Sequence, residues 1–211
     1  MKTPVKFIVA VALALAAFSS PAGAAPEEKI PPKVAGSFYP ADAAELSSAV
    51  EYLFFNVPSK ALKEDPIALW VPHAGLQYSG QMAALAYYEV KGRKYDAIIL
   101  LGPSHRVAVQ VASIYPKGVF QTPIGGVPID AELAKKIADN LPDAKFDPLT
   151  YAEEHSLEVQ FPFLLKVFPK TKIVAILMGP MDLSMDKRVA EAIVKACAGR
   201  KVLLVASSDM S

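Results

Sequence analysis

Cysteine is nearly absent from this chain of 211 residues, which contains one cysteine, one tryptophan and three histidines. A single cysteine excludes an internal disulfide, and Cys197 lies in a helical pattern that favours a small buried side chain over a reactive thiol. The glycine-rich phosphate loops GxGxxG and GxxxxGK are absent, and so is the serine nucleophile motif GxSxG. Their absence argues against nucleotide binding through a glycine-rich loop and against hydrolysis by a serine nucleophile of this type.

An excess of charge of one sign is also lacking, with 22 basic and 21 acidic residues. Lys2 and Lys6 precede the uninterrupted apolar run 7–18, and small residues dominate 19–25. This order is typical of a secretory signal peptide, and the run is too short to span a membrane comfortably. We therefore predict that residues 1–25 are a signal peptide and that the protein is exported, either to the periplasm or out of the cell.

Without those residues, 20 basic side chains stand against 21 acidic ones, and no basic tract remains. This balance argues against a nucleic-acid partner, and no membrane attachment is expected after signal cleavage. Hydrophobic residues make up 53% of the chain and charged residues 20%, which favours a well-filled core. Residues 26–32 are predicted to form an extended, proline-rich lead-in, and residues 33–211 a single domain.

Strand-like and helical patterns alternate along this domain. The predicted strands are 67–71, 96–101, 107–115, 172–179 and 201–206, and the predicted helices are 43–55, 79–88, 130–140, one opened by 153–160, and 186–198. The segment 122–129 carries two prolines and two glycines and predicts a turn with short strands at a sheet edge. Together they predict a three-layer α/β fold: a mainly parallel or mixed sheet with helices on both faces.

Two of the three histidines follow apolar strands at a proline break. His73 follows 67–71, an unbroken apolar run typical of a strand buried on both faces, and His105 follows 96–101. Asp209 follows 201–206. Because the carboxyl ends of parallel strands meet at one edge of a sheet, we expect these side chains to converge. Two imidazoles with a carboxylate suit a non-haem metal site, although the pattern alone also fits histidines with separate structural roles.

The third histidine, His155, stands in an acidic segment that is predicted to open a helix. His155 and Glu158 are three residues apart and would share one face of that helix. We predict that these two residues either orient the metal ligands or form a proton-transfer pair. Pro162 is predicted to bend or break this helix.

Six motifs follow one another between Lys33 and the last residue. They are Val34-Ala35-Gly36-Ser37-Phe38-Tyr39-Pro40, Pro72-His73-Ala74-Gly75 with Tyr78-Ser79-Gly80, Gly102-Pro103-Ser104-His105, Thr122-Pro123-Ile124-Gly125, Glu154-His155-Ser156-Leu157-Glu158-Val159-Gln160-Phe161-Pro162 and Ser207-Ser208-Asp209. In these motifs the chain resembles the Memo-like family, whose bacterial and archaeal members are called AmmeMemoRadiSam system protein B. The resemblance implies a fold similar to the catalytic subunits of class III extradiol dioxygenases.

The same resemblance implies metal binding by His73 and His105, with iron (Fe²⁺) or copper as the cofactor. It also implies catalytic roles for His155, Glu154 and Asp209 beside that metal. In the family the chain continues beyond the position of Ser211, so we expect the domain to be truncated at its C-terminus.

Two classes of function follow from the resemblance and the residues. The first is a metal-dependent oxidoreductase, dioxygenase-like, acting on an unknown small molecule or peptide. The second is a protein that does not catalyse, in which the same pocket binds a peptide or an anion, or which acts with the operon partners of the AmmeMemoRadiSam system.

Overall fold

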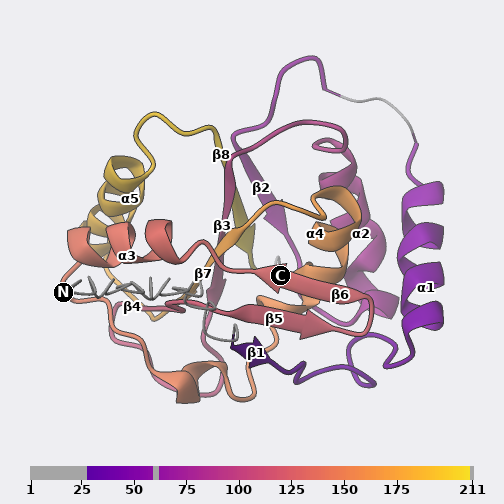
Figure 1. Cartoon of the computed structure of the whole chain (residues 1–211), viewed down its shortest axis with the longest axis horizontal. Coiled ribbons are helices and arrows are strands. Elements are labelled where there is room, and N and C mark those ends of the chain that lie inside the picture. The colour runs from indigo at the N-terminus through magenta and orange to yellow at the C-terminus, as the bar shows by residue number, and fades with distance from the viewer. Residues whose placement is uncertain (1–27, 59–61, 210–211) are drawn as a thin grey trace, which may run out of the picture.

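A five-stranded sheet in the order β2-β8-β3-β7-β4 runs through the centre of the computed structural model, which describes residues 28–58 and 62–209 (Figure 1). The predicted signal peptide, residues 1–25, and Ser211 lie outside the described residues. The first four of these strands are parallel, and β4 is antiparallel to β7. The strands are β2 (Ala68–Val71), β3 (Ala97–Pro103), β4 (Ala112–Ile114), β7 (Ile173–Met178) and β8 (Val202–Ser207).

Helices cover both faces of this sheet, which confirms the predicted three-layer α/β fold (Figure 1). One face carries α1 (Ala43–Phe55), α2 (Leu76–Tyr88) and α4 (Phe161–Val167), and the other carries α3 (Ala131–Asn140) and α5 (Leu183–Ala196). Ile98 packs in the first core and Ile99 in the second, as the alternation of a strand requires. Cys197, at the end of α5, is buried as predicted, and burial raises the pKa of its thiol. Within the described ranges, no helix has the length and apolar character needed to cross a membrane.

The strand that precedes His73 is buried on one face only, so the prediction of burial on both faces is wrong. Leu69 and Val71 are buried, whereas Ala68 is exposed and Trp70 is 64% exposed. The reason is topological, because β2 is the end strand of the sheet. An apolar run does not by itself distinguish a central strand from an edge strand.

A second, three-stranded sheet contains the segment predicted to form a turn with short strands. β5 (Val119–Thr122) and β6 (Gly125–Pro128) form an antiparallel hairpin, and β1 (Lys29–Ile30) pairs in parallel with β5. Part of the predicted extended lead-in is therefore a strand.

Two further predictions need correction near the site. Within 107–115 only β4 is a strand, and the preceding residues form the loop that carries His105.

The predicted helix at 153–160 is a turn followed by the 3₁₀ helix η2 (Glu158–Gln160), and α4 begins at Phe161. The turn arises because the backbone N–H groups of residues 155 and 156 bond to the side chain of Glu154. Pro162 stands at the start of α4, where its missing N–H costs nothing. Another 3₁₀ helix, η1 (Pro148–Tyr151), precedes this turn.

Helix α2 begins at Leu76 rather than at the predicted Ser79, whose hydroxyl donates to the carbonyl of Ala74. Gly75 caps α2, and a side chain there would come within 3.2 Å of the carbonyl oxygen of Phe38. That oxygen accepts a 2.8 Å hydrogen bond from the N–H of Leu76. The small residue after His73 therefore allows the loop carrying Phe38 to approach the site.

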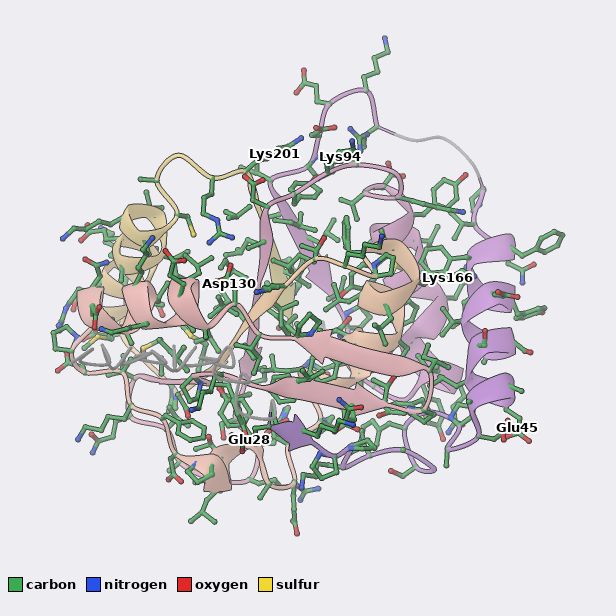
Figure 2. All side chains as sticks on the ribbon, in the orientation of Figure 1. Glu28, Glu45, Lys94, Asp130, Lys166 and Lys201 are labelled. Atoms are coloured by element: carbon green, nitrogen blue, oxygen red, sulfur yellow. The ribbon has the colours of Figure 1, made fainter. Side chains whose placement is uncertain are left out.

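Asp130, labelled in Figure 2, caps α3, and its N–H donates a 2.8 Å hydrogen bond to the carbonyl of Ile173, the first residue of β7. Its carboxylate accepts a 3.0 Å hydrogen bond from the N–H of Leu133 and a 2.7 Å hydrogen bond from Arg200. Burial alone raises the pKa of Asp130, but these two donors outweigh burial and lower it below its ordinary value. The carboxylate therefore contributes stability at neutral pH that is lost as the pH falls through its folded-state pKa.

We predict that Asp130→Ala lowers the free energy of unfolding at pH 7 by about 1 to 2 kcal/mol, because both the helix cap and the ion pair are lost. Asp130→Asn should cost less, since asparagine also caps helices. Urea unfolding at pH 7 and near pH 3 measures both effects. The difference between wild type and Asp130→Asn should shrink in acid, and a difference that grows there would contradict this account.

Candidate metal centre

His73, His105 and Asp209 occupy equivalent places at the carboxyl edge of the sheet. Each is the second residue after its strand ends, with β2 ending at 71, β3 at 103 and β8 at 207. Since β8 lies between β2 and β3, the turns after these strands are neighbours. The ring centroids of His73 and His105 are 5.2 Å apart.

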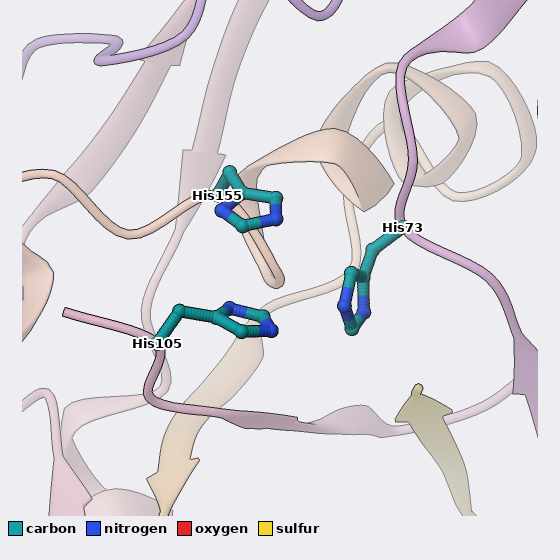
Figure 3. A group of neighbouring side chains, drawn as sticks. All are labelled: His73, His105 and His155. Atoms are coloured by element: carbon teal, nitrogen blue, oxygen red, sulfur yellow. The ribbon is translucent and has the colours of Figure 1, made fainter. Parts of the chain in front are cut away.

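His155 joins this pair from the turn that precedes η2. Its ring stacks on His105 with the centroids 4.6 Å apart and lies 5.5 Å from the ring of His73. Figure 3 shows the three rings turned toward a common space. One nitrogen from each ring lies within 4.8 Å of the chosen nitrogens of the other two, and imidazole nitrogens are common ligands of transition metals. The three histidines could therefore hold one metal ion.

Hydrogen bonds around Ser207 determine which nitrogen of His73 carries the proton. The single hydroxyl hydrogen of Ser207 goes to the carbonyl oxygen of Ser156 at 2.6 Å, and its oxygen accepts from Gln160 Nε2 at 3.0 Å. The remaining 3.1 Å contact, to His73 Nδ1, must then have the imidazole as donor. By this assignment Nδ1 carries the hydrogen, and Nε2 presents a lone pair.

That lone pair has no hydrogen-bond partner. The ring of His73 is 1% exposed, and its Nε2 is the one buried side-chain nitrogen or oxygen in the described residues that lacks a hydrogen bond. Asp209 Oδ1 lies 3.1 Å away, but without the angles of a hydrogen bond. A lone pair beside a carboxylate is unfavourable unless a cation is present, so this nitrogen fits a metal ligand.

Glu154 fixes the orientation of His105. Its carboxylate accepts from the backbone N–H of His105 at 2.5 Å and from His105 Nδ1 at 2.9 Å, and also from the N–H groups of His155 and Ser156, each at 2.8 Å. Burial raises the pKa of Glu154, but the donors outweigh burial and lower it. An ionised acceptor holds the hydrogen of His105 on Nδ1, which leaves Nε2 of that ring free.

His155 is held less tightly than the other two rings. Its Nδ1 lies 3.4 Å from Glu154 Oε1, and its ring also contacts the ring of Phe38, with centroids 4.6 Å apart. Burial lowers the pKa of both His73 and His155, and the neighbouring imidazoles lower it further, while Glu154 and Asp209 oppose the change. The net lowering favours neutral imidazoles at pH 7.

Glu158 does not share the surroundings of His155, contrary to the pairing predicted from a helical face. Its buried carboxylate accepts from the N–H groups of Lys33 and Val34 and from the hydroxyl of Tyr39 at 2.6 Å. Burial and the hydrogen bond to Glu158 raise the pKa of Tyr39. Glu158 thus anchors residues 33–39, the loop that places Phe38 on His155.

No role was predicted for Ser207 or Gln160, although both stand in the quoted motifs. Gln160 donates to the carbonyl of Pro72 as well as to Ser207, and its own amide oxygen accepts from the hydroxyl of Tyr87. Ser207 is a buried polar residue at the last position of a strand, and such a residue usually has hydrogen-bond partners nearby. This position could have indicated its role from the sequence.

The fold and this site together define a three-layer α/β protein with a histidine cluster at the carboxyl edge of its sheet. The model of the Memo-like protein family matches residues 31–211. The chain therefore belongs to the Memo-like family, and the resemblance stated from its motifs is confirmed.

Relatives called MEMO1 family proteins are similar along most of the chain. The protein from Desulfurococcus amylolyticus is 35% identical over 196 residues, which cover 87% of this chain and 69% of the relative. The proteins from Caldivirga maquilingensis and Thermoplasma volcanium are 36% and 34% identical, over 85% of this chain and 67% and 66% of their own lengths. The chain thus spans about two thirds of each of these relatives.

We predict that Glu154→Gln weakens binding of Fe²⁺ or Cu²⁺ by about 10- to 100-fold, the usual cost of losing a carboxylate that orients a ligand. Isothermal titration with each metal measures the affinity, under anaerobic conditions for iron. Glu158→Gln is the matched control: it neutralises a buried glutamate of the same turn whose bonds go to the 33–39 loop. Equal losses of affinity in the two variants would contradict the assigned role of Glu154.

Proposed function

We propose that this protein binds one non-haem metal ion, iron or copper, through His73 and His105, and that the ion serves a redox reaction. The observation that carries the proposal is the buried Nε2 of His73, which has no hydrogen-bond partner. A cation bound at this nitrogen would occupy its lone pair and offset the nearby carboxylate of Asp209.

The contacts of the second ring nitrogen support His73 and His105 as the ligands. A histidine that binds a metal nearly always donates its other ring N–H to a carboxylate, a carbonyl or another fixed group. His73 donates to Ser207, and His105 donates to Glu154. His155 lacks a bond of that quality, since its contact with Glu154 is 3.4 Å. This difference favours a role for His155 in proton transfer beside the metal rather than as a metal ligand.

Iron or copper held by two imidazoles with open positions supplies Lewis-acid and one-electron chemistry. In this proposal Glu154 keeps the ring of His105 in place and prevents its Nδ1 from binding a metal. His155, neutral at pH 7, accepts or returns a proton at a group bound beside the ion. Asp209, 63% exposed, stands at the rim, where an arriving ligand would meet it first.

The charges at the centre disfavour the alternative of a simple anion-binding pocket. An anion would need positive charge, but burial favours neutral His73 and His155, and two carboxylates lie beside the rings. We propose that the substrate is a small molecule or a peptide, and that the predicted export brings the protein to its metal in the periplasm or outside the cell.

We predict that His73→Ala and His105→Ala each abolish stoichiometric metal binding, because each removes one of two proposed ligands. His155→Ala should retain the metal and lower turnover by about 100-fold or more, as loss of a general acid or base does. The three variants serve as controls for one another, since they remove the same side chain from one cluster.

Metal content of protein purified from its own compartment, with oxygen uptake in the presence of catechols, tests these roles. Far-UV circular dichroism establishes that each variant is folded. Full metal occupancy in either His73→Ala or His105→Ala would overturn the proposal, and loss of metal in His155→Ala would make His155 a third ligand.

A further inference from the structure

Two acceptors face the two nitrogens of the His73 ring, and each could take its hydrogen. Ser207 Oγ lies 3.1 Å from Nδ1, and Asp209 Oδ1 lies 3.1 Å from Nε2. A neutral imidazole carries one hydrogen, so it can donate to only one of them. A hydrogen on Nδ1 leaves Nε2 free to bind a metal, whereas a hydrogen on Nε2 blocks that nitrogen.

Charge alone favours Asp209 as the acceptor. A hydrogen bond to a carboxylate is roughly twice as strong as one between neutral groups. The distance from Asp209 Oδ1 to His73 Nε2 is already that of a hydrogen bond, and only the angles are unsuitable. A turn of the carboxylate would therefore create a second arrangement, in which a hydrogen occupies the nitrogen proposed for the metal.

The other contacts of Ser207 leave its hydroxyl only one way to meet His73. Its single hydrogen goes to the carbonyl oxygen of Ser156 at 2.6 Å, and its oxygen accepts from Gln160 Nε2 at 3.0 Å. A serine oxygen has two lone pairs, so one remains for a donor at Nδ1. Turning the hydroxyl hydrogen toward the ring would break the bond to Ser156. Ser207 is therefore an acceptor for His73.

Gln160 keeps this arrangement in place. Its side chain is fully buried, and both ends of its amide are bonded. Nε2 also donates to the carbonyl oxygen of Pro72 at 2.8 Å, and Oε1 accepts from the hydroxyl of Tyr87 at 3.2 Å. A flipped amide would place its oxygen against the carbonyl oxygen of Pro72, so the hydrogen bonds define the orientation of the amide. Gln160 therefore remains a donor to Ser207.

We propose that Ser207 is a positioning residue, which holds the hydrogen of His73 on Nδ1 against competition from Asp209 and so keeps Nε2 available for a metal. Asp209 is then the competing acceptor of the metal-free centre. The inference rests on the proposed function for its effect on metal affinity. The position of the hydrogen itself can be observed in the absence of any metal.

Nitrogen-15 NMR of the metal-free full chain, labelled at histidine, reports which ring nitrogen carries the hydrogen. The sequence contains three histidines, and the signals of His73 are those missing from His73→Ala. We expect the hydrogen on Nδ1 in the wild type and on Nε2 in Ser207→Ala. Ser113→Ala is the matched control, because it removes another buried hydroxyl of the same sheet, whose contacts are with Asp147 and Thr150. It should leave the hydrogen on Nδ1.

Anaerobic isothermal titration with Fe²⁺ measures the effect on metal affinity. Ser207→Ala should weaken binding by about 10- to 100-fold, the usual cost of losing a group that orients a ligand. The same substitution should cost several-fold less in an Asp209→Ala background, because the competing acceptor is gone. Ser113→Ala should bind as the wild type does.

A hydrogen of His73 found on Nε2 in the wild type, or on Nδ1 in Ser207→Ala, would overturn the proposal. So would losses of affinity of equal size with and without Asp209. A wild-type protein that binds no metal would overturn the proposed function instead, and the NMR comparison would still decide the role of Ser207.

Discussion

The insertion of β8 between β2 and β3 is the constraint on which the rest of the site depends. The parallel register pairs Val71 with Ser207, so the serine hydroxyl arrives beside the ring that follows β2. A shift by one residue would turn Ser207 to the other face of the sheet. His73 Nδ1 would then lose the acceptor that keeps its hydrogen in place, and Nε2 would no longer be fixed as the nitrogen with the free lone pair.

Two buried glutamates, four residues apart, organise the surroundings of the cluster. A buried carboxylate is stable only when several donors surround it, and each of these collects donors from a different part of the chain. Glu154 gathers N–H groups from the His105 loop and from its own turn, and Glu158 gathers those of residues 33 and 34. The cost of burying charge is thus offset by bonds that connect loops, and a helix through this segment would have consumed the same N–H groups.

Local pattern was sufficient to predict the layers of the fold and the places of His73 and His105, because an apolar run with a proline break specifies a strand end. It was insufficient for the exposure of Trp70, since edge position depends on the strand order of the whole sheet. It was also insufficient for the start of α4, where the side chain of Glu154 competes with backbone pairing. The tautomer of His73 depends on Ser207, 134 residues away, and no local pattern contains that information.

The long sequence separations within the centre have a consequence for biosynthesis. His73 depends on a residue 134 positions later, Glu158 on residues about 125 positions earlier, and His105 on one 49 positions later. Contacts of such separation form late, because the intervening chain must first be ordered. The three imidazoles therefore take up their final arrangement only after synthesis has passed residue 207 and the sheet has closed.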